Sequence, residues 1–318
     1  MLVASDDYQE IRAQCWSVLP TRLRLDDRPS DWARANRGGP LVGSFLEGPD
    51  LAPGGMLYCV DIPFGRVFSI SPAGEWQLVS EYDGWPNGLK IQADGRLLVA
   101  DHKNGLVEID PDTGKATRLL THRNSQQFLG LNDLHIDARG TVWFSDQGQT
   151  GLHDPTGKVY RWTRGGPLVC VLDRLPSPNG VRVSADGREL YVAVTRDNSV
   201  WRAPLMETGE PSKVGRFAMF YGPTGPDGIH LDSAGRLWVC LPGADSVWVL
   251  NPRGEVDARI RFPAGSFPSN LVVDEGAETA YFTCSVHQSI FRATFSFAST
   301  RPESSARNFH GQPETQPA

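Results

Sequence analysis

Six side chains that carry a carbonyl or carboxylate oxygen recur at nearly even intervals along this chain of 318 residues. Each opens a short apolar segment, and successive members lie 40, 45, 47, 48 and 43 residues apart. Side-chain oxygens are the ligands that hard divalent cations prefer. If folding brings the six positions together, the sequence predicts a cation site with two formal negative charges. These residues are Glu47, Asn87, Asn132, Asn179, Asp227 and Asn270.

The same residue types have a second explanation. Asn and Asp often precede strands because their side chains hydrogen-bond the backbone of a turn. That explanation covers five of the six positions. It does not cover Glu47, because glutamate is a poor former of such turns, and the metal interpretation is therefore favoured.

Each oxygen-bearing residue is followed by a hairpin of two short strands. In the copy that begins at Asn132, a first apolar alternation is followed by a turn in which Gly140 supplies the positive φ. Six such copies with a period of 40 to 48 residues are typical of a β-propeller. The predicted fold is therefore all-β, a six-bladed β-propeller. Its second strands are predicted at 57–61, 97–101, 142–144, 190–194, 237–241 and 280–283.

The ends of the chain differ from the repeats. Residues 1–40 are predicted to be an N-terminal extension, with a short helix over 5–17 and a wrap over one face of the propeller beyond it. The propeller is expected over 41–298 and a polar, disordered tail over 299–318. A strand from one terminus is expected to complete the last blade and remove an open edge. The candidates for that strand are residues 23–25 and 41–45.

Composition limits the classes of function. The net charge is −6 and no basic run is present, which argues against nucleic acid as a partner. No apolar run reaches the length of a membrane span, and the first residues lack the basic start and apolar core of a signal peptide. The five cysteines have no metal-ligand spacing. A cytoplasmic protein that acts on a small molecule is expected.

A divalent cation at the mouth of a propeller favours hydrolysis of an ester. It can polarise a carbonyl group as a Lewis acid and lower the pKa of a bound water. A carboxylate beside it can take a proton from the attacking water or attack the substrate directly. Glu47 and Asp227 are the two acids of the ring, and each is a candidate ligand and a candidate catalytic residue.

Three copies open with a recognisable motif. The motifs are Glu47-Gly48-Pro49, Pro178-Asn179-Gly180 and Pro226-Asp227-Gly228. Together these motifs resemble the senescence marker protein 30/gluconolactonase family, and the similarity covers about residues 46–294, nearly the whole expected propeller. The resemblance implies an enzyme that opens the ring of a sugar-acid lactone with one divalent metal, Ca²⁺ first and Zn²⁺, Mn²⁺ or Mg²⁺ as alternatives.

The resemblance also implies roles for particular residues. Glu47, Asn179 and Asp227 are expected to hold the metal, with Asn132 as a further contact to metal or substrate. Asp227 is expected to be the base or the nucleophile, and Glu47 is the second catalytic candidate. The predicted substrate-binding residues are Asn132, Asn87, Gln149 and Tyr221.

The chain departs from the animal members of the family near the third ring residue. Those members have an arginine two positions before the third-blade Asn, where this chain has Gly130. An acid that follows the third hairpin in those members has no clear equivalent, and Gln147 and Gln149 occupy that region. The identity of the lactone is therefore open.

Weaker candidates for the pocket come from residues next to the ring. His102, His153 and His287 follow strand ends or lie in loops, although a lone histidine is more often structural. Two functions remain as alternatives, a phosphotriesterase that uses the same site and a non-catalytic propeller that binds a partner. The oligomeric state is not predicted. Apolar walls are expected from Trp85, Phe128 and Tyr221.

Overall fold

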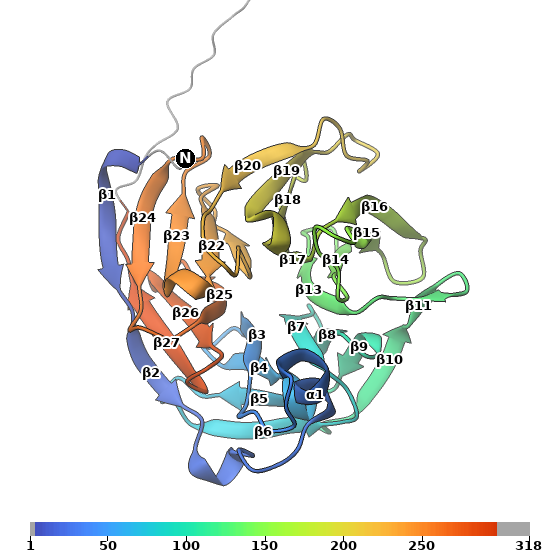
Figure 1. Ribbon diagram of the computed structural model, residues 1–318, viewed down its shortest axis with the longest axis vertical. Coiled ribbons are helices and arrows are strands. Elements are labelled where there is room, and N and C mark those ends of the chain that lie inside the picture. Colours follow the sequence, from blue (N-terminus) through green and yellow to red (C-terminus); the bar gives the residue numbers. More distant parts are fainter. Residues whose placement is uncertain (1–3, 298–318) are drawn as a thin grey trace, which may run out of the picture.

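Six twisted sheets surround a central axis in the computed structural model, which describes residues 4–297 (Figure 1). Each sheet is one blade, and its first strand lies nearest the axis. The predicted six-bladed propeller is confirmed. The strands of the first three blades are β3 (Leu46–Leu51), β4 (Leu57–Asp61), β5 (Arg66–Ile70) and β6 (Trp76–Glu81); β7 (Pro86–Ile91), β8 (Leu97–Asp101), β9 (Gly105–Ile109) and β10 (Ala116–Leu120); and β13 (Leu131–Ile136), β14 (Val142–Asp146), β15 (Gly157–Trp162) and β16 (Leu168–Leu175).

The last three blades follow the same order, and two of them gain a strand from the N-terminal segment. A two-stranded hairpin of β11 (His122–Arg123) and β12 (Gln126–Gln127) projects between the second and third blades. The remaining strands are β17 (Pro178–Val183), β18 (Glu189–Val194), β19 (Ser199–Pro204) and β20 (Gly215–Met219); β21 (Ile229–Leu231), β22 (Leu237–Leu241), β23 (Ser246–Leu250) and β24 (Val256–Arg261); and β25 (Pro268–Asp274), β26 (Thr279–Cys284) and β27 (Ser289–Thr294).

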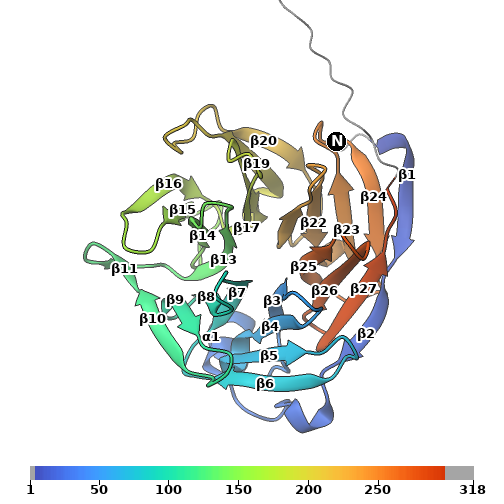
Figure 2. The same ribbon diagram turned by 180° about the vertical axis from the view of Figure 1, so that it is seen from behind.

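The N-terminal segment forms strands where a helix was expected. β1 (Ala4–Arg12) pairs in parallel with β24, and β2 (Gln14–Val18) pairs antiparallel with β27 (Figure 2). The predicted helix over 5–17 is therefore wrong. Without β1 and β2 the outer strands of two blades would present unpaired backbone groups, and this requirement outweighs a weak local helix signal.

The ring closes as expected but with a different segment. A strand from the N-terminus completes the sixth blade, yet that strand is β2 and neither candidate segment is used. Residues 41–45 are irregular, and a 3₁₀ turn, η1 (Thr21–Leu23), ends where the other candidate begins. The expected tail, 299–318, lies outside the described residues.

The hydrophobic core lies between the blades, because each sheet buries both of its faces against its neighbours. Trp143 of β14 packs in one cluster with Val181 and Val192 of the next blade. Trp238 of β22 packs likewise with Leu271 and Phe282. Both tryptophans therefore pack between neighbouring blades.

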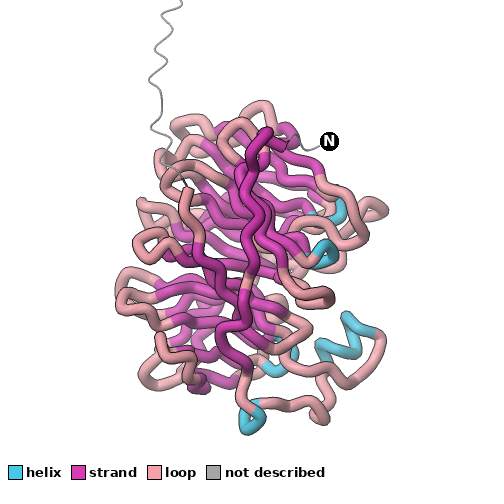
Figure 3. Tube along the Cα trace, turned by 90° about the vertical axis from the view of Figure 1, so that its left-hand side faces the viewer, coloured by secondary structure: helices cyan, strands magenta, loops and turns pink. Residues whose placement is uncertain are grey.

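One face of the propeller carries most of the helical turns (Figure 3). The α-helix α1 (Asp31–Arg37) lies over this face, close to the axis in projection. Three 3₁₀ turns follow second strands: η2 (Ile62–Phe64), η3 (Thr195–Asp197) and η4 (Pro242–Ala244). Between residues 4 and 297, no helix is both long enough and apolar enough to cross a membrane.

Candidate functional site

A cavity of ≈ 630 Å³ opens on the axis, and five of the six ring residues line it. They come from five different blades, so the repeat places in one cavity side chains that are up to 180 residues apart in the sequence. Gln149 lines the same cavity, as do residues of α1. The five ring residues are Glu47, Asn87, Asn132, Asn179 and Asp227.

β-bulges help to place the ring residues at the axis. In five blades the pairing of the first and second strands shifts register at or next to the ring residue, for example between Glu47 and Asp50 and between Pro178 and Val181. A bulge re-aims the side chains of its strand and often lies beside a functional site. In the fifth blade Asp227 precedes β21 and is held by a bond from its N–H to the carbonyl of Cys240, 3.0 Å long.

Glycines after the ring residues allow the first strands to approach one another. A Cβ on Gly48 would lie 2.5 Å from the carbonyl oxygen of Asn87, and φ there is +53°. A Cβ on Gly180 would lie 2.6 Å from the backbone nitrogen of Ile229. Only glycine fits such close backbone contacts, which explains why glycine directly follows four of the six ring residues, at positions 48, 88, 180 and 228.

Glu47 is buried, and the Gly48 N–H donates to its Oε2 at 2.9 Å. The neighbouring side chains of Ser269 and Asn270 favour its ionised form and partly offset the rise in its pKa. Burial nevertheless raises the pKa of Glu47 well above its usual value, and the negative charge of Asp227 adds to the effect. Asn270, the sixth ring residue, therefore supports Glu47 and is absent from the cavity lining.

Asp227 is half-buried and lines the cavity. Burial in the propeller raises its pKa to about 7, a hydrogen bond from Asn179 opposes the shift, and the charge of Asp133 adds to it. Asn132 donates from Nδ2 to Gln147 Oε1 at 2.9 Å. The side-chain carbonyl oxygens of Asn132 and Asn179 therefore remain available to another ligand.

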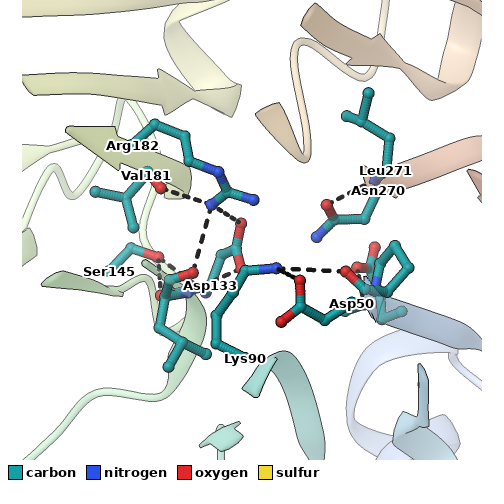
Figure 4. A network of polar contacts seen from close by, with 12 residues as sticks. Asp50, Lys90, Asp133, Ser145, Val181, Arg182, Asn270 and Leu271 are labelled. Atoms are coloured by element: carbon teal, nitrogen blue, oxygen red, sulfur yellow. Dashed lines mark hydrogen bonds and ion pairs between the residues drawn. The ribbon is translucent and has the colours of Figure 1, made fainter. Parts of the chain in front are cut away.

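A second layer of charged side chains lies further along the first strands (Figure 4). Asp50, Lys90 and Arg182 each follow a ring residue by three positions, and Asp133 directly follows Asn132. Lys90 Nζ is 3.1 Å from Asp50 Oδ1, and Arg182 Nη1 is 3.6 Å from Asp133 Oδ2. The same Arg182 nitrogen donates to the carbonyl of Val181 at 2.7 Å. These pairs support the ring from beneath.

The residues present fit a divalent cation. Two carboxylates with raised pKa values face one cavity with two amide oxygens beside them: the charge of Asp227 raises the pKa of Glu47, and the charge of Asp133 raises that of Asp227. A cation would relieve this repulsion. Asp133 Oδ2 is buried and accepts no hydrogen bond from the residues that the structure describes. A cluster of three or more His, Cys, Asp or Glu side chains arranged for a metal is absent from the described part of the chain, so the amides are required for such a site.

Helix α1 roofs the cavity. Ser30 caps its first turn through a 3.4 Å bond from the N–H of Ala33, and Gly38 ends it in the left-handed conformation with φ +70°. Its apolar side, Trp32 and Ala33, packs against Ile62 of η2. The helix is tied to the third blade by a bond from Gln149 Nε2 to Asn36 Oδ1, 2.8 Å long.

Two arginines also line the cavity, and sequence reasoning did not identify them. Arg37 is the last residue of α1, and Arg196 lies in η3. Partial burial lowers the pKa of Arg37, and the charge of Asp227 opposes the shift. The cluster of basic residues at the end of a short helix was the only sequence signal for Arg37, and it also describes an ordinary helix end.

Several expected pocket residues lie elsewhere. Tyr221 is 79% exposed and is not among the described residues that line the cavity. Phe128 packs on Phe144 and Tyr160 in the third blade. The ring of Trp85 packs near that of His102, with centroids 5.9 Å apart, and Trp85 is not among the described residues that line the cavity. His102 and His153 line the cavity and His287 does not, while substrate contacts by any of these residues stay predictions.

Comparison with known proteins identifies the family. The model of the SMP-30/gluconolactonase/LRE-like region matches residues 45–286. The chain belongs to this family. It is 28% identical to a gluconolactonase of Zymomonas mobilis, over 89% of this chain and 78% of that protein. It is 27% identical to lactonase drp35 of Staphylococcus aureus, over 70% of this chain and 71% of that protein.

Solved structures of this family share the fold. A gluconolactonase of Xanthomonas campestris superposes with a TM-score of 0.70 at 22% identity, over 92% of this chain and 97% of that one. A protein described as calcium-binding regucalcin, from Agrobacterium tumefaciens, superposes with a TM-score of 0.69 at 21% identity, over 90% of this chain and 95% of that one. The family resemblance expected from the three motifs is confirmed.

The departure from the animal members of the family at Gly130 has a structural explanation. A Cβ on Gly130 would lie 2.3 Å from the imidazole ring of His102, and φ there is +147°. His102 therefore occupies the space that a side chain at position 130 would need. Its burial lowers the pKa of the imidazole, so a neutral ring stands at this wall of the cavity.

Proposed function

We propose that this protein hydrolyses a lactone with a divalent cation held by Glu47, Asn132, Asn179 and Asp227. The observation that supports the proposal is that these four side chains, from four blades, line one cavity. The relatives named above are a gluconolactonase and a lactonase, which is the enzyme class expected from the sequence. Their names do not favour a phosphotriesterase or a non-catalytic binding module.

The two carboxylates are suited to different roles. Glu47 is buried and accepts a hydrogen bond from the Gly48 N–H, so it is the better fixed ligand. Asp227 is half-buried, faces the cavity and has a raised pKa, so it is the better base. A bound divalent cation, with Ca²⁺ our first expectation, would polarise the lactone carbonyl and help to orient the water.

The reaction then follows from the position of Asp227. Its carboxylate takes a proton as the water oxygen bonds to the carbonyl carbon. The ring C–O bond breaks, and the protonated Asp227 returns the proton to the departing ring oxygen. The product is an open-chain hydroxy acid, and its carboxyl proton is lost to solvent.

The test is hydrolysis of a panel of aldonolactones by metal-stripped protein with each divalent cation added back. Asp227→Asn should lower kcat by roughly 10²- to 10⁴-fold, as expected for loss of a general base. Asp154→Asn is the matched control, because Asp154 is exposed in the same loop as His153 but is not part of the described cavity lining. Undiminished turnover in Asp227→Asn, or in protein freed of metal, would refute the proposal.

A further inference from the structure

Two guanidinium groups line the cavity without a carboxylate partner. Arg37 and Arg196 make no ion pair within residues 8–297, whereas Arg34, on the same helix as Arg37, pairs with Asp31 at 2.6 Å. No side-chain hydrogen bond is made by either group in that part of the chain. Their N–H donors are therefore available to a ligand.

Aromatic rings orient Arg37 without using those donors. Its guanidinium carbon lies 4.8 Å from the centroid of Phe45 and 5.6 Å from that of Trp32. Contact with a ring face holds the guanidinium plane by cation–π attraction and leaves the N–H groups at its edge free. Trp32 is buried and Phe45 packs against the same cluster, so this support is rigid.

Both arginines face the site from above. Burial raises the pKa of Asp227, and the positive charges of Arg37 and Arg196 both lower it. Both arginines therefore act on the same carboxylate. They are exposed at the mouth, whereas Glu47 is only 4% exposed. The cavity thus has carboxylates at its floor and guanidinium groups at its rim.

The charges of the lining indicate what the rim would bind. The charged lining residues are two carboxylates and these two arginines. A divalent cation would balance the carboxylates and leave the two positive charges at the rim uncompensated. A neutral sugar lactone would leave both arginines without a partner, while a planar or tetrahedral anion matches the donor fork of arginine.

We propose that Arg37 and Arg196 form an anion-recognition subsite, and that the substrate is a lactone with a second, ionised group, a carboxylate or a phosphate, remote from the ring carbonyl. This inference rests on the proposed lactonase function. The lactone carbonyl would lie at the floor near Asp227, and the ionised group would lie between α1 and η3.

The experiment compares three lactones of similar size: neutral D-glucono-1,5-lactone, the carboxylate D-glucaro-1,4-lactone and the phosphate 6-phospho-D-glucono-1,5-lactone. The wild type should show the highest kcat/KM with one of the two anionic lactones, and the better one identifies the ionised group. Arg37→Gln and Arg196→Gln should each lower the ratio of anionic to neutral kcat/KM by roughly tenfold or more, the usual effect of a charge-assisted bond. Arg34→Gln, the matched control on α1, should keep the wild-type ratio.

A second measurement does not depend on turnover. Calorimetric binding of the product anions, glucarate and 6-phosphogluconate against gluconate, should show the same preference and the same loss in Arg37→Gln. Preference of the wild type for the neutral lactone, or an equal effect of Arg37→Gln on all three lactones, overturns the subsite and leaves the lactonase proposal intact. Absence of hydrolysis for every lactone, with product binding still charge-selective, overturns the lactonase proposal and supports the rim as an anion site.

Discussion

Arg182 Nη1 lies 3.6 Å from Asp133 Oδ2, and both side chains are almost completely buried beneath the ring. The pair joins β17 to β13, the strands that carry Asn179 and Asn132. Asp133 Oδ2 has no hydrogen-bond donor in the described structure, so the nearby guanidinium is its main compensation.

We expect Arg182→Met to destabilise the fold by about 3–5 kcal/mol, because the substitution leaves a buried, uncompensated carboxylate. Urea unfolding followed by tryptophan fluorescence measures the change. The double variant Arg182→Met/Asp133→Asn should recover much of the loss. A loss equally large in the double variant would mean that packing of Arg182, and not its charge, is what matters.

His135 predicts a pH dependence of stability. Burial, together with Arg182 and Lys90, lowers its pKa from 6.5 to about 3. The unfolded chain therefore binds a proton below pH 6.5 that the folded protein refuses until about pH 3, and stability falls as the pH decreases across this window. One such group contributes a slope of roughly 1.4 kcal/mol per pH unit well inside the window.

The measurement is a series of urea unfolding curves between pH 7 and pH 4. In His135→Gln the free energy of unfolding should depend less steeply on pH than in the wild type, by the amount that corresponds to about one proton taken up on unfolding. His122→Gln is a suitable control, because His122 is exposed in the β11–β12 hairpin. An unchanged slope in His135→Gln would rule out this histidine as a source of the pH dependence.

Cation binding should stabilise the folded protein. The ligands come from different blades, so the unfolded chain offers no equivalent site, and free cation at 100 times its Kd adds about 2.7 kcal/mol. The midpoint of thermal unfolding should rise with added Ca²⁺ and return to its starting value with chelator. Glu47→Gln should abolish the rise while Glu75→Gln, an exposed acid on the first blade, retains it. An equal rise in both variants would place the cation elsewhere.

Gly130→Ala tests the contact between residue 130 and His102. The added Cβ would collide with the imidazole at a backbone conformation that alanine rarely adopts, so we expect a loss of stability of about 1–3 kcal/mol and a displaced ring. Thermal unfolding measures the loss. Adding His102→Ala to this variant should recover the stability lost to the collision with the imidazole. The loss caused by the strained backbone conformation of residue 130 should remain. Full stability in Gly130→Ala alone would show that the loop shifts without cost.

Periodicity explains why so much of the fold was predictable. The second strands β4, β8 and β22 begin and end where the sequence predicts, because turn residues bound each apolar run. Five ring residues meet at one cavity because equivalent positions of a propeller share an axis. Both results follow from patterns that repeat within the chain.

Features that occur once were not predictable in the same way. The strand β1 acquires its partner about 250 residues away, so no local pattern announces it. Arg37 reaches the cavity only because α1 folds back over the mouth, and that path depends on tertiary contacts such as the bond from Gln149 to Asn36. The role of Gly130 became visible only with His102 beside it.

The pairing of β1 and β2 with the last blades affects the order of events on the ribosome. A chain is made from its N-terminus, yet these strands acquire their partners β24 and β27 only when translation is nearly complete. The segment that follows them contains α1, so we expect the roof of the cavity to remain unanchored in nascent chains until that moment. Stalled chains that end before Val256 should accordingly be cut by protease within residues 4–45, and released full-length protein should resist.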